Sequence, residues 1–169
     1  MNKEALKALQ APLKAKYKTD PQAASIRLRA EANGAEGIAC KVDTGRALVE
    51  AGLHPAAGGD GFHICSGDML LEALVACAGV TFQAVATAFD VDAKDLKVTA
   101  EGDLDFRGTL GVAKEASVGF QNIRLNFDFA AGAPEQTLDK LIELTERYCV
   151  VLQTIKQAPQ LKITQRTTG

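Results

Sequence analysis

Two cysteines lie in apolar segments that the residue pattern predicts to be helices, and together they could carry redox chemistry. Cys77 is near the centre of the stretch from Asp68 to Phe89, and Cys149 belongs to a second apolar stretch that ends near Ile155. If the two helices cross with their Cα atoms within about 4.4–6.8 Å, the thiols can form a disulfide. One thiolate would attack the O–O bond of a peroxide and become a sulfenic acid, which the other thiol would capture.

The same two cysteines have a simpler interpretation as small core residues. Free cysteine is among the most buried residue types, and it packs like a small hydrophobe. On residue types alone this simpler interpretation is favoured. Redox chemistry therefore needs a further argument.

Activation of Cys77 as a nucleophile is expected to require a cation. Cys77 lies about two and a half turns into its helix, beyond the first turn where the helix dipole acts. Its pKa would then be lowered by an Arg or His brought from elsewhere in the chain. The candidate cations are Arg46, His54 and His63, and the candidate carboxylates that could orient an Arg are Asp68 and Glu72.

Two other patterns could suggest ligands, and neither is specific. One pattern could suggest a metal site: His63-Ile64-Cys65, with His54 and Cys40 nearby in sequence. It contains no Cys-x-x-Cys or His-x-x-x-His pair, so the ligands would have to come from separate strands. The Gly58-Gly59-Asp60-Gly61 run follows no parallel strand and is not closed by Gly-Lys-Ser/Thr, so it is better interpreted as a flexible lead-in than as a phosphate loop. We expect no metal and no cofactor.

The elements that position the cysteines predict an α+β fold. The helix around Cys77 is apolar or small on every face from Ala73 to Phe82, which indicates a buried helix. A second helix opens at Ala133-Pro134-Glu135 and is stopped by Pro159. Alternating or short apolar runs predict strands at Ser25 to Ala32, Ile38 to Val42, Arg46 to Ala51, Leu96 to Phe106, Val118 to Phe129 and Leu161 to Arg166, with a turn at Asn33-Gly34. Antiparallel sheets wrapped around two long helices cannot cover all of the apolar helix faces, so we expect a homodimer.

Length and composition limit the class of protein. The 169 residues fit a single domain, residues 1–169, with a helical N-terminal arm over residues 1–20. A net charge of -2 and the absence of Trp argue against a nucleic-acid partner. No secretory signal is present, and Asp68, Glu72 and Gln83 interrupt the apolar helix, so we expect a cytoplasmic protein without a membrane partner.

The chain resembles the OsmC/Ohr superfamily, the osmotically inducible and organic hydroperoxide resistance proteins. Residues Ser66 to Cys77, preceded by Gly58-Gly59-Asp60-Gly61, are similar to the family's Ser-Pro-x-Glu-Leu-Leu-x-Ala-Ala-x-x-x-Cys helix. Arg147-Tyr148-Cys149-Val150-Val151 is similar to the family's stretch with Cys-Pro. The chain departs from the pattern at Gly67, where Pro is frequent, at Asp68, where Glu stands, and at Val150, where Pro follows the second Cys.

The resemblance implies an intertwined homodimer with two active sites at the subunit interface. It implies a thiol-dependent peroxidase acting on organic hydroperoxides, with Cys77 as peroxidatic and Cys149 as resolving residue, recycled by a dithiol or a thioredoxin-like reductant. The supporting Arg of the best-characterised branch comes from the first hairpin, and Arg46 is our candidate for that role. The alternative is a non-catalytic dimer that binds an apolar small molecule and uses both cysteines for packing.

Overall fold

The structure, a computed structural model, describes residues 2–5, 7–8, 10–11, 19, 31–34, 40–43, 48–111 and 113–167. Arg46 and most of the strand predicted at Ser25 to Ala32 lie outside the described residues. In the N-terminal arm, residues 3–5, 7–8 and 10–11 are helical. The elements in chain order are β1 (Glu31–Gly34), β2 (Cys40–Asp43), β3 (Leu48–Gly52), η2 (Pro55–Ala57), β4 (Ile64–Cys65), α2 (Ser66–Ala88), β5 (Lys94–Asp103), α3 (Phe106–Thr109), β6 (Asn122–Ala130), α4 (Glu135–Tyr148) and α5 (Val150–Lys156).

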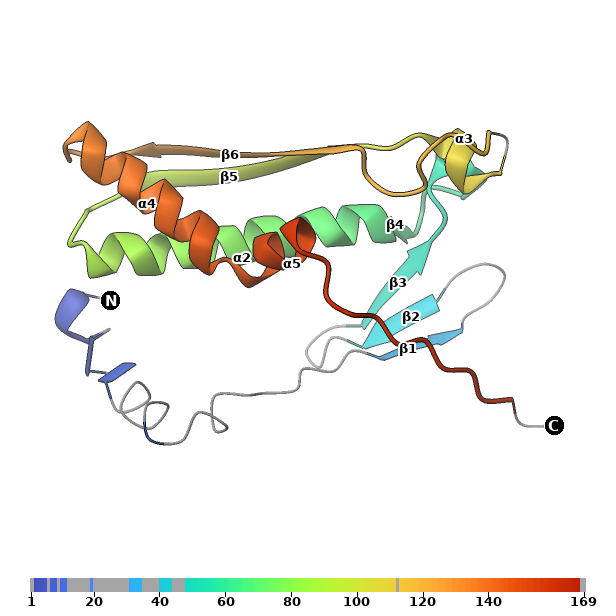
Figure 1. The fold of residues 1–169 in the computed structure, drawn as a ribbon, viewed down its shortest axis with the longest axis horizontal. Coiled ribbons are helices and arrows are strands. Elements are labelled where there is room, and N and C mark those ends of the chain that lie inside the picture. The colour runs from blue at the N-terminus through green and yellow to red at the C-terminus, as the bar shows by residue number, and fades with distance from the viewer. Residues whose placement is uncertain are drawn as a thin grey trace.

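The long helix α2 is the element against which the rest of the core packs (Figure 1). The hairpin of β5 and β6 runs beside it on one side, and α4 crosses it on another. Helix α2 is also the one described helix long and apolar enough to cross a membrane, a property that the core helices of soluble proteins share. Within the chain, it packs against β5, α4 and α5.

The β5–β6 hairpin supplies one apolar face to the core. The strands pair antiparallel, with Val98 opposite Phe127 and Ala100 opposite Leu125. Exposed and half-buried residues alternate along both strands, because successive side chains of a strand point to opposite faces. The alternation predicted for Ile123, Leu125, Phe127 and Phe129 is confirmed.

The second sheet lies at the N-terminal end of α2 and has the order β1-β2-β3-β4. The first three strands form an antiparallel meander, as predicted, and β4 joins β3 in parallel. The predicted turn at Asn33-Gly34 is wrong, because both residues belong to β1 and pair with Lys41 and Cys40. The loop before β4 contains the short helix η2, which Gly58 ends with a φ of 91° that glycine readily adopts.

Two predictions for the C-terminal part need correction. The single helix predicted from Pro134 to Ile155 is two helices, α4 and α5, with Cys149 between them in an extended conformation. The strand predicted at Leu161 to Arg166 is absent, since these residues have no regular structure, and Leu161 and Ile163 are 83% and 93% exposed. Alternation alone does not make a strand when no neighbouring strand pairs with it.

Only one side of α2 is buried within the single chain. Leu74, Ala78 and Phe82 are fully buried, whereas Val80 is 71% exposed. The buried residues form two core clusters, one around Phe82 and Leu141 and another around Leu74, Ala78 and Cys149. The fold is therefore a mixed helix and sheet structure with one long helix that is buried along one face.

Candidate functional site

Helix α2 carries Cys77 into the second of these core clusters. Cys77 is half-buried and packs beside Leu74 and Ala78, which have no exposed surface. Apolar side chains of β5 and β6 line the same cluster: Val98, Ala100, Ile123, Leu125 and Phe127. The half-buried Cys77 thus lies at the edge of an apolar core.

Cys149 lies at the corner between α4 and α5. Its backbone is extended, with φ -71° and ψ 107°, so it ends α4 and begins α5. Its amide donates to the carbonyl of Thr145 at 2.9 Å, and its own carbonyl accepts from the amide of Gln153 at 2.9 Å. The residue has no exposed surface. The corner therefore directs the Cys149 thiol inward, toward α2.

The two thiols, both in the reduced form, interact directly. Cys77 and Cys149 pack in the same cluster, and the Cys149 thiol, acting as a hydrogen-bond donor, lowers the pKa of Cys77. Burial raises the pKa of Cys149, and the negative charge of the neighbouring Cys77 raises it further. The pair is thus asymmetric: the pKa of Cys77 is lowered, and that of Cys149 is raised.

The pKa of Cys77 is lowered by hydrogen bonds, which together outweigh the upward effect of burial. The groups that lower it most are the backbone N–H groups of Val151 and Val150 and the thiol of Cys149. Thr81 contributes least, since its single hydroxyl proton also bonds to the Cys77 carbonyl at 2.7 Å. Val150 and Val151 begin α5, whose free N–H groups favour negative charge. Among the described residues, none of these four groups is a positively charged side chain. Arg46 lies outside the described residues, so its role as the supporting cation stays a prediction.

The two histidines proposed as candidate cations are engaged elsewhere. His54 accepts a hydrogen bond from the Ala56 amide at 3.0 Å on Nδ1 and stacks on Phe106 with 4.9 Å between ring centroids. His63 lies 3.0 Å from a carboxylate oxygen of Asp60 and 3.5 Å from one of Glu50. Both histidines therefore serve the loop before α2.

The two carboxylates proposed as supporting residues are exposed near the start of α2. Asp68 lies in the first turn, nine residues before Cys77, or about 13 Å along the helix axis. It lines a cavity of about 400 Å³ together with His54, Cys65 and Phe120. Glu72 is one turn further along and is exposed. Neither carboxylate is one of the groups that shift the pKa of Cys77.

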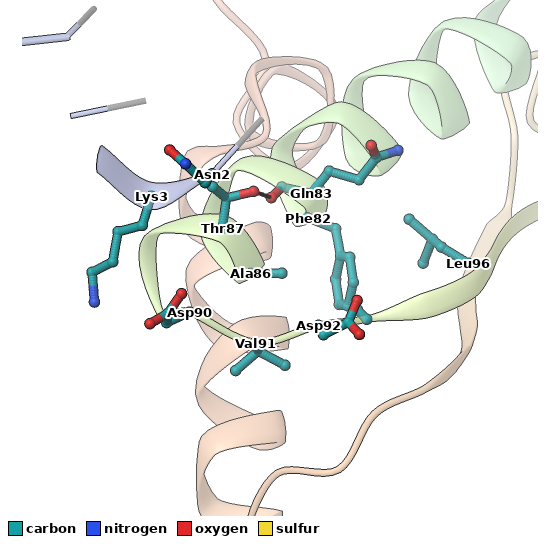
Figure 2. Close-up of a pocket in the computed structure, with 11 residues that line it drawn as sticks. Asn2, Lys3, Phe82, Gln83, Ala86, Thr87, Asp90, Val91, Asp92 and Leu96 are labelled. Atoms are coloured by element: carbon teal, nitrogen blue, oxygen red, sulfur yellow. Dashed lines mark hydrogen bonds between the residues drawn. The ribbon is translucent and has the colours of Figure 1, made fainter. Parts of the chain in front are cut away.

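Two cavities of the described chain lie away from the thiols. Figure 2 shows one of about 340 Å³ at the C-terminal end of α2, where Phe82, Val91 and Leu96 form the apolar wall and Asp90 and Asp92 the rim. Neither this cavity nor the one beside Asp68 is lined by Cys77 or Cys149. Within the described ranges, no group of three or more His, Cys, Asp or Glu residues could hold a metal ion.

Sequence reasoning missed the amides that support Cys77. Backbone groups carry no residue signature, so Val150 and Val151 were not candidates. One signal was present: Val150 has an N–H group at the position where a Pro, which has none, is usual in the similar proteins. The Glu146, Gln153 and Lys156 side chains, which connect α4 to α5, were not candidates either.

Comparison with known proteins places these features in a family. The sequence model of the OsmC-like protein family matches residues 58–164, which include α2, both cysteines and α5. No curated protein matches the chain.

Solved structures share the fold at low sequence identity. An OsmC-like protein from Mycoplasma pneumoniae superposes with a TM-score of 0.67 at 17% identity, over 85% of this chain and 97% of that one. A protein from Legionella pneumophila, described as an organic hydroperoxide resistance protein OsmC, gives 0.61 at 16% identity over 78% and 90%. The organic hydroperoxide resistance protein OhrB of Bacillus subtilis gives 0.54 at 14% identity over 79% and 93%.

Proposed function

The chain belongs to the OsmC-like protein family, and from this premise we propose that it is a thiol-dependent peroxidase that reduces organic hydroperoxides. The observation that carries the proposal is the packing of Cys77 and Cys149 in one apolar cluster, with their pKa values displaced in opposite directions. Such a pair provides one nucleophilic thiolate and one protonated thiol to resolve it. Two neighbours in fold are named organic hydroperoxide resistance proteins, which supports the substrate class.

The proposed reaction has two steps at the protein. The Cys77 thiolate attacks the outer oxygen of a hydroperoxide ROOH, the O–O bond breaks, and the products are Cys77 sulfenic acid and, after uptake of one proton, the alcohol ROH. The Cys149 sulfur then attacks the sulfenic sulfur, and the Cys77–Cys149 disulfide forms as water leaves. The peroxide gains two electrons, and the two thiols lose them.

The catalyst must then be reduced. A small dithiol or a thioredoxin-like protein would attack the disulfide, pass through a mixed disulfide, and return both cysteines to thiols while itself becoming a disulfide. The apolar side chains around Cys77, among them Val98 and Leu125, suit a hydroperoxide with a hydrocarbon body.

We further propose that the working form is a cytoplasmic homodimer. Three apolar or aromatic residues near the thiols are exposed: Val80 on α2 (71%), and Tyr148 (57%) and Val150 (69%) at the α4–α5 corner. Apolar surface of this kind beside a reactive thiol favours cover by a second copy. A second copy would also supply the wall that a substrate site at Cys77 needs, since the cavities described above lie elsewhere.

A thiol titration tests the proposed reaction. One equivalent of cumene hydroperoxide per chain should remove two titratable thiols from the wild-type protein. Cys77→Ser should abolish the loss, and Cys149→Ser should reduce it to one thiol, because the sulfenic acid then has no resolving partner. Cys65→Ser is the matched control and should still lose two. A wild-type thiol count that does not change would refute the peroxidase and leave the apolar-ligand-binding dimer.

A further inference from the structure

The corner between α4 and α5 is bridged by three side chains, Glu146, Gln153 and Lys156, which we call the corner clamp. The Gln153 side-chain amide donates to the backbone carbonyl of Glu146 at 2.7 Å. The Lys156 ammonium forms an ion pair with the Glu146 carboxylate. Both contacts start on α5 and end on the last turn of α4, so they span the break at Cys149.

The clamp compensates for the interruption of the helix. The last carbonyls of a helix have no partner within it, and the Glu146 carbonyl belongs to this group in α4. Gln153 supplies the missing donor from α5, seven residues further along the chain. The bond fixes the direction in which α5 leaves the corner. A change in that direction would move the first residues of α5, whose Val151 and Leu152 side chains pack against the cluster that holds both thiols.

We propose that Gln153 and Lys156 are positioning residues for the thiol pair, because the corner clamp aims the N–H groups of Val150 and Val151 at the Cys77 sulfur. The inference rests on the proposed function for its biological meaning. The alkylation of Cys77 that tests it needs no peroxide. Among the described residues, the side chains from β5, β6 and α5 that pack in the cluster with Cys77 are apolar, and Cys149 is the titratable group packed in the same cluster. The direction of α5 therefore controls both the amide donors and the thiol donor.

A purely stabilising role would have a different signature. The Lys156 and Glu146 side chains are 49% and 48% exposed, and exposed ion pairs contribute little to the free energy of unfolding. Helix α4 carries a comparable pair, Lys140 with Glu143 at 2.6 Å, with side chains 45% and 62% exposed. That pair lies within one helix and does not touch the corner, so it provides a matched control.

The test compares the pH dependence of Cys77 alkylation by iodoacetamide in full-length variants, read by mass spectrometry of the Cys77 peptide. Gln153→Met removes the amide donor while keeping side-chain length and helix propensity. Lys156→Met removes the charge, Lys156→Arg retains it, and Lys140→Met breaks the control pair. The thermal midpoint of each variant is measured in parallel.

The Gln153→Met, Lys156→Met double variant should raise the pH midpoint of alkylation and slow the reaction at pH 7 by about threefold. Gln153→Met alone should act in the same direction, and Lys156→Arg and Lys140→Met should match wild type. A double variant with an unchanged midpoint, or a Lys140→Met protein with an equal shift, would overturn the proposal. Alkylation needs no oxidant, so a wild type inert to cumene hydroperoxide would refute the proposed function without deciding the clamp.

Discussion

Replacing Val150 with proline tests whether backbone amides activate Cys77. The Val150 N–H is one of the donors to the Cys77 sulfur, and proline has no N–H group. The substitution fits the backbone in other respects: Cys149 is extended, as the residue before a proline prefers, and proline is favoured at the first position of a helix. The Val150 side chain is 69% exposed, so its loss removes little packing.

The size of the effect follows from the loss of one donor. A hydrogen bond to a charged group contributes about 1.5–3 kcal/mol, and the lower end applies here because Cys77 is only half-buried. A loss of about 1.4 kcal/mol lowers the thiolate fraction about tenfold at a pH below the pKa. The remaining donors, Val151 and Cys149, can tighten, so we expect a decrease of about threefold to tenfold.

The assay is the rate of Cys77 alkylation as a function of pH. In wild type this rate rises as the pH passes through a pKa that lies below the ordinary thiol value. In Val150→Pro the rise should move to higher pH. The midpoint is the criterion, since a more basic thiolate is also a better nucleophile and partly restores the rate.

Val150→Ala is the control for Val150→Pro. It shortens the side chain and keeps the N–H group, so its midpoint should equal that of wild type. If Val150→Pro and Val150→Ala share one midpoint and one melting temperature, amide donation is not what lowers the pKa of Cys77. A cation from outside the described residues would then be the remaining explanation.

Three further predictions separate the thiol pair from the rest of the core. Cys149→Ser retains a hydroxyl donor and should keep the alkylation midpoint of Cys77 close to wild type, whereas Cys149→Ala removes the donor and should raise it; iodoacetamide profiles measure both. Leu74→Ala should lower the free energy of unfolding by about 2–5 kcal/mol and slow disulfide formation, since Leu74 packs in the cluster that holds both thiols. Phe82→Ala should lower the free energy of unfolding by about 3–5 kcal/mol. It should leave the pH midpoint of Cys77 alkylation unchanged, because Phe82 belongs to the other cluster. Urea unfolding measures the loss of stability in both the Leu74 and the Phe82 variants.

The sequence was sufficient to predict the elements whose signal is local. The apolar run around Cys77 predicted a helix from Asp68 to Phe89, and the structure has α2 at Ser66–Ala88. The alternation from Ile123 to Phe129 predicted β6, because a strand with one buried face has a period of two.

The corner at Cys149 could not be predicted in the same way. The residues from Thr145 to Leu152 contain no Gly or Pro, and their apolar spacing continues across the break. The interruption depends on contacts between helices, including the inward Cys149 thiol and the bond from Gln153 to Glu146. Such contacts exist only once α2, α4 and α5 are assembled.

The source of thiolate stabilisation was missed for a related reason. The helix dipole was considered only for α2, the helix that contains Cys77, and Cys77 is too far from its start. In the structure the relevant helix start belongs to α5. A side chain can interact with the free amides of any helix whose N-terminus lies against it. Distance along the sequence does not indicate which helix that is.

The position of Cys149 far along the chain from Cys77 has a thermodynamic consequence. A bond between the two sulfurs would join residues about 70 positions apart, and closing a loop of this size restricts the unfolded chain by an amount equivalent to about 4 kcal/mol in the chain-entropy model. The oxidised protein would then melt at a higher temperature than the reduced one. The melting temperature would thereby report whether the two cysteines are oxidised or reduced.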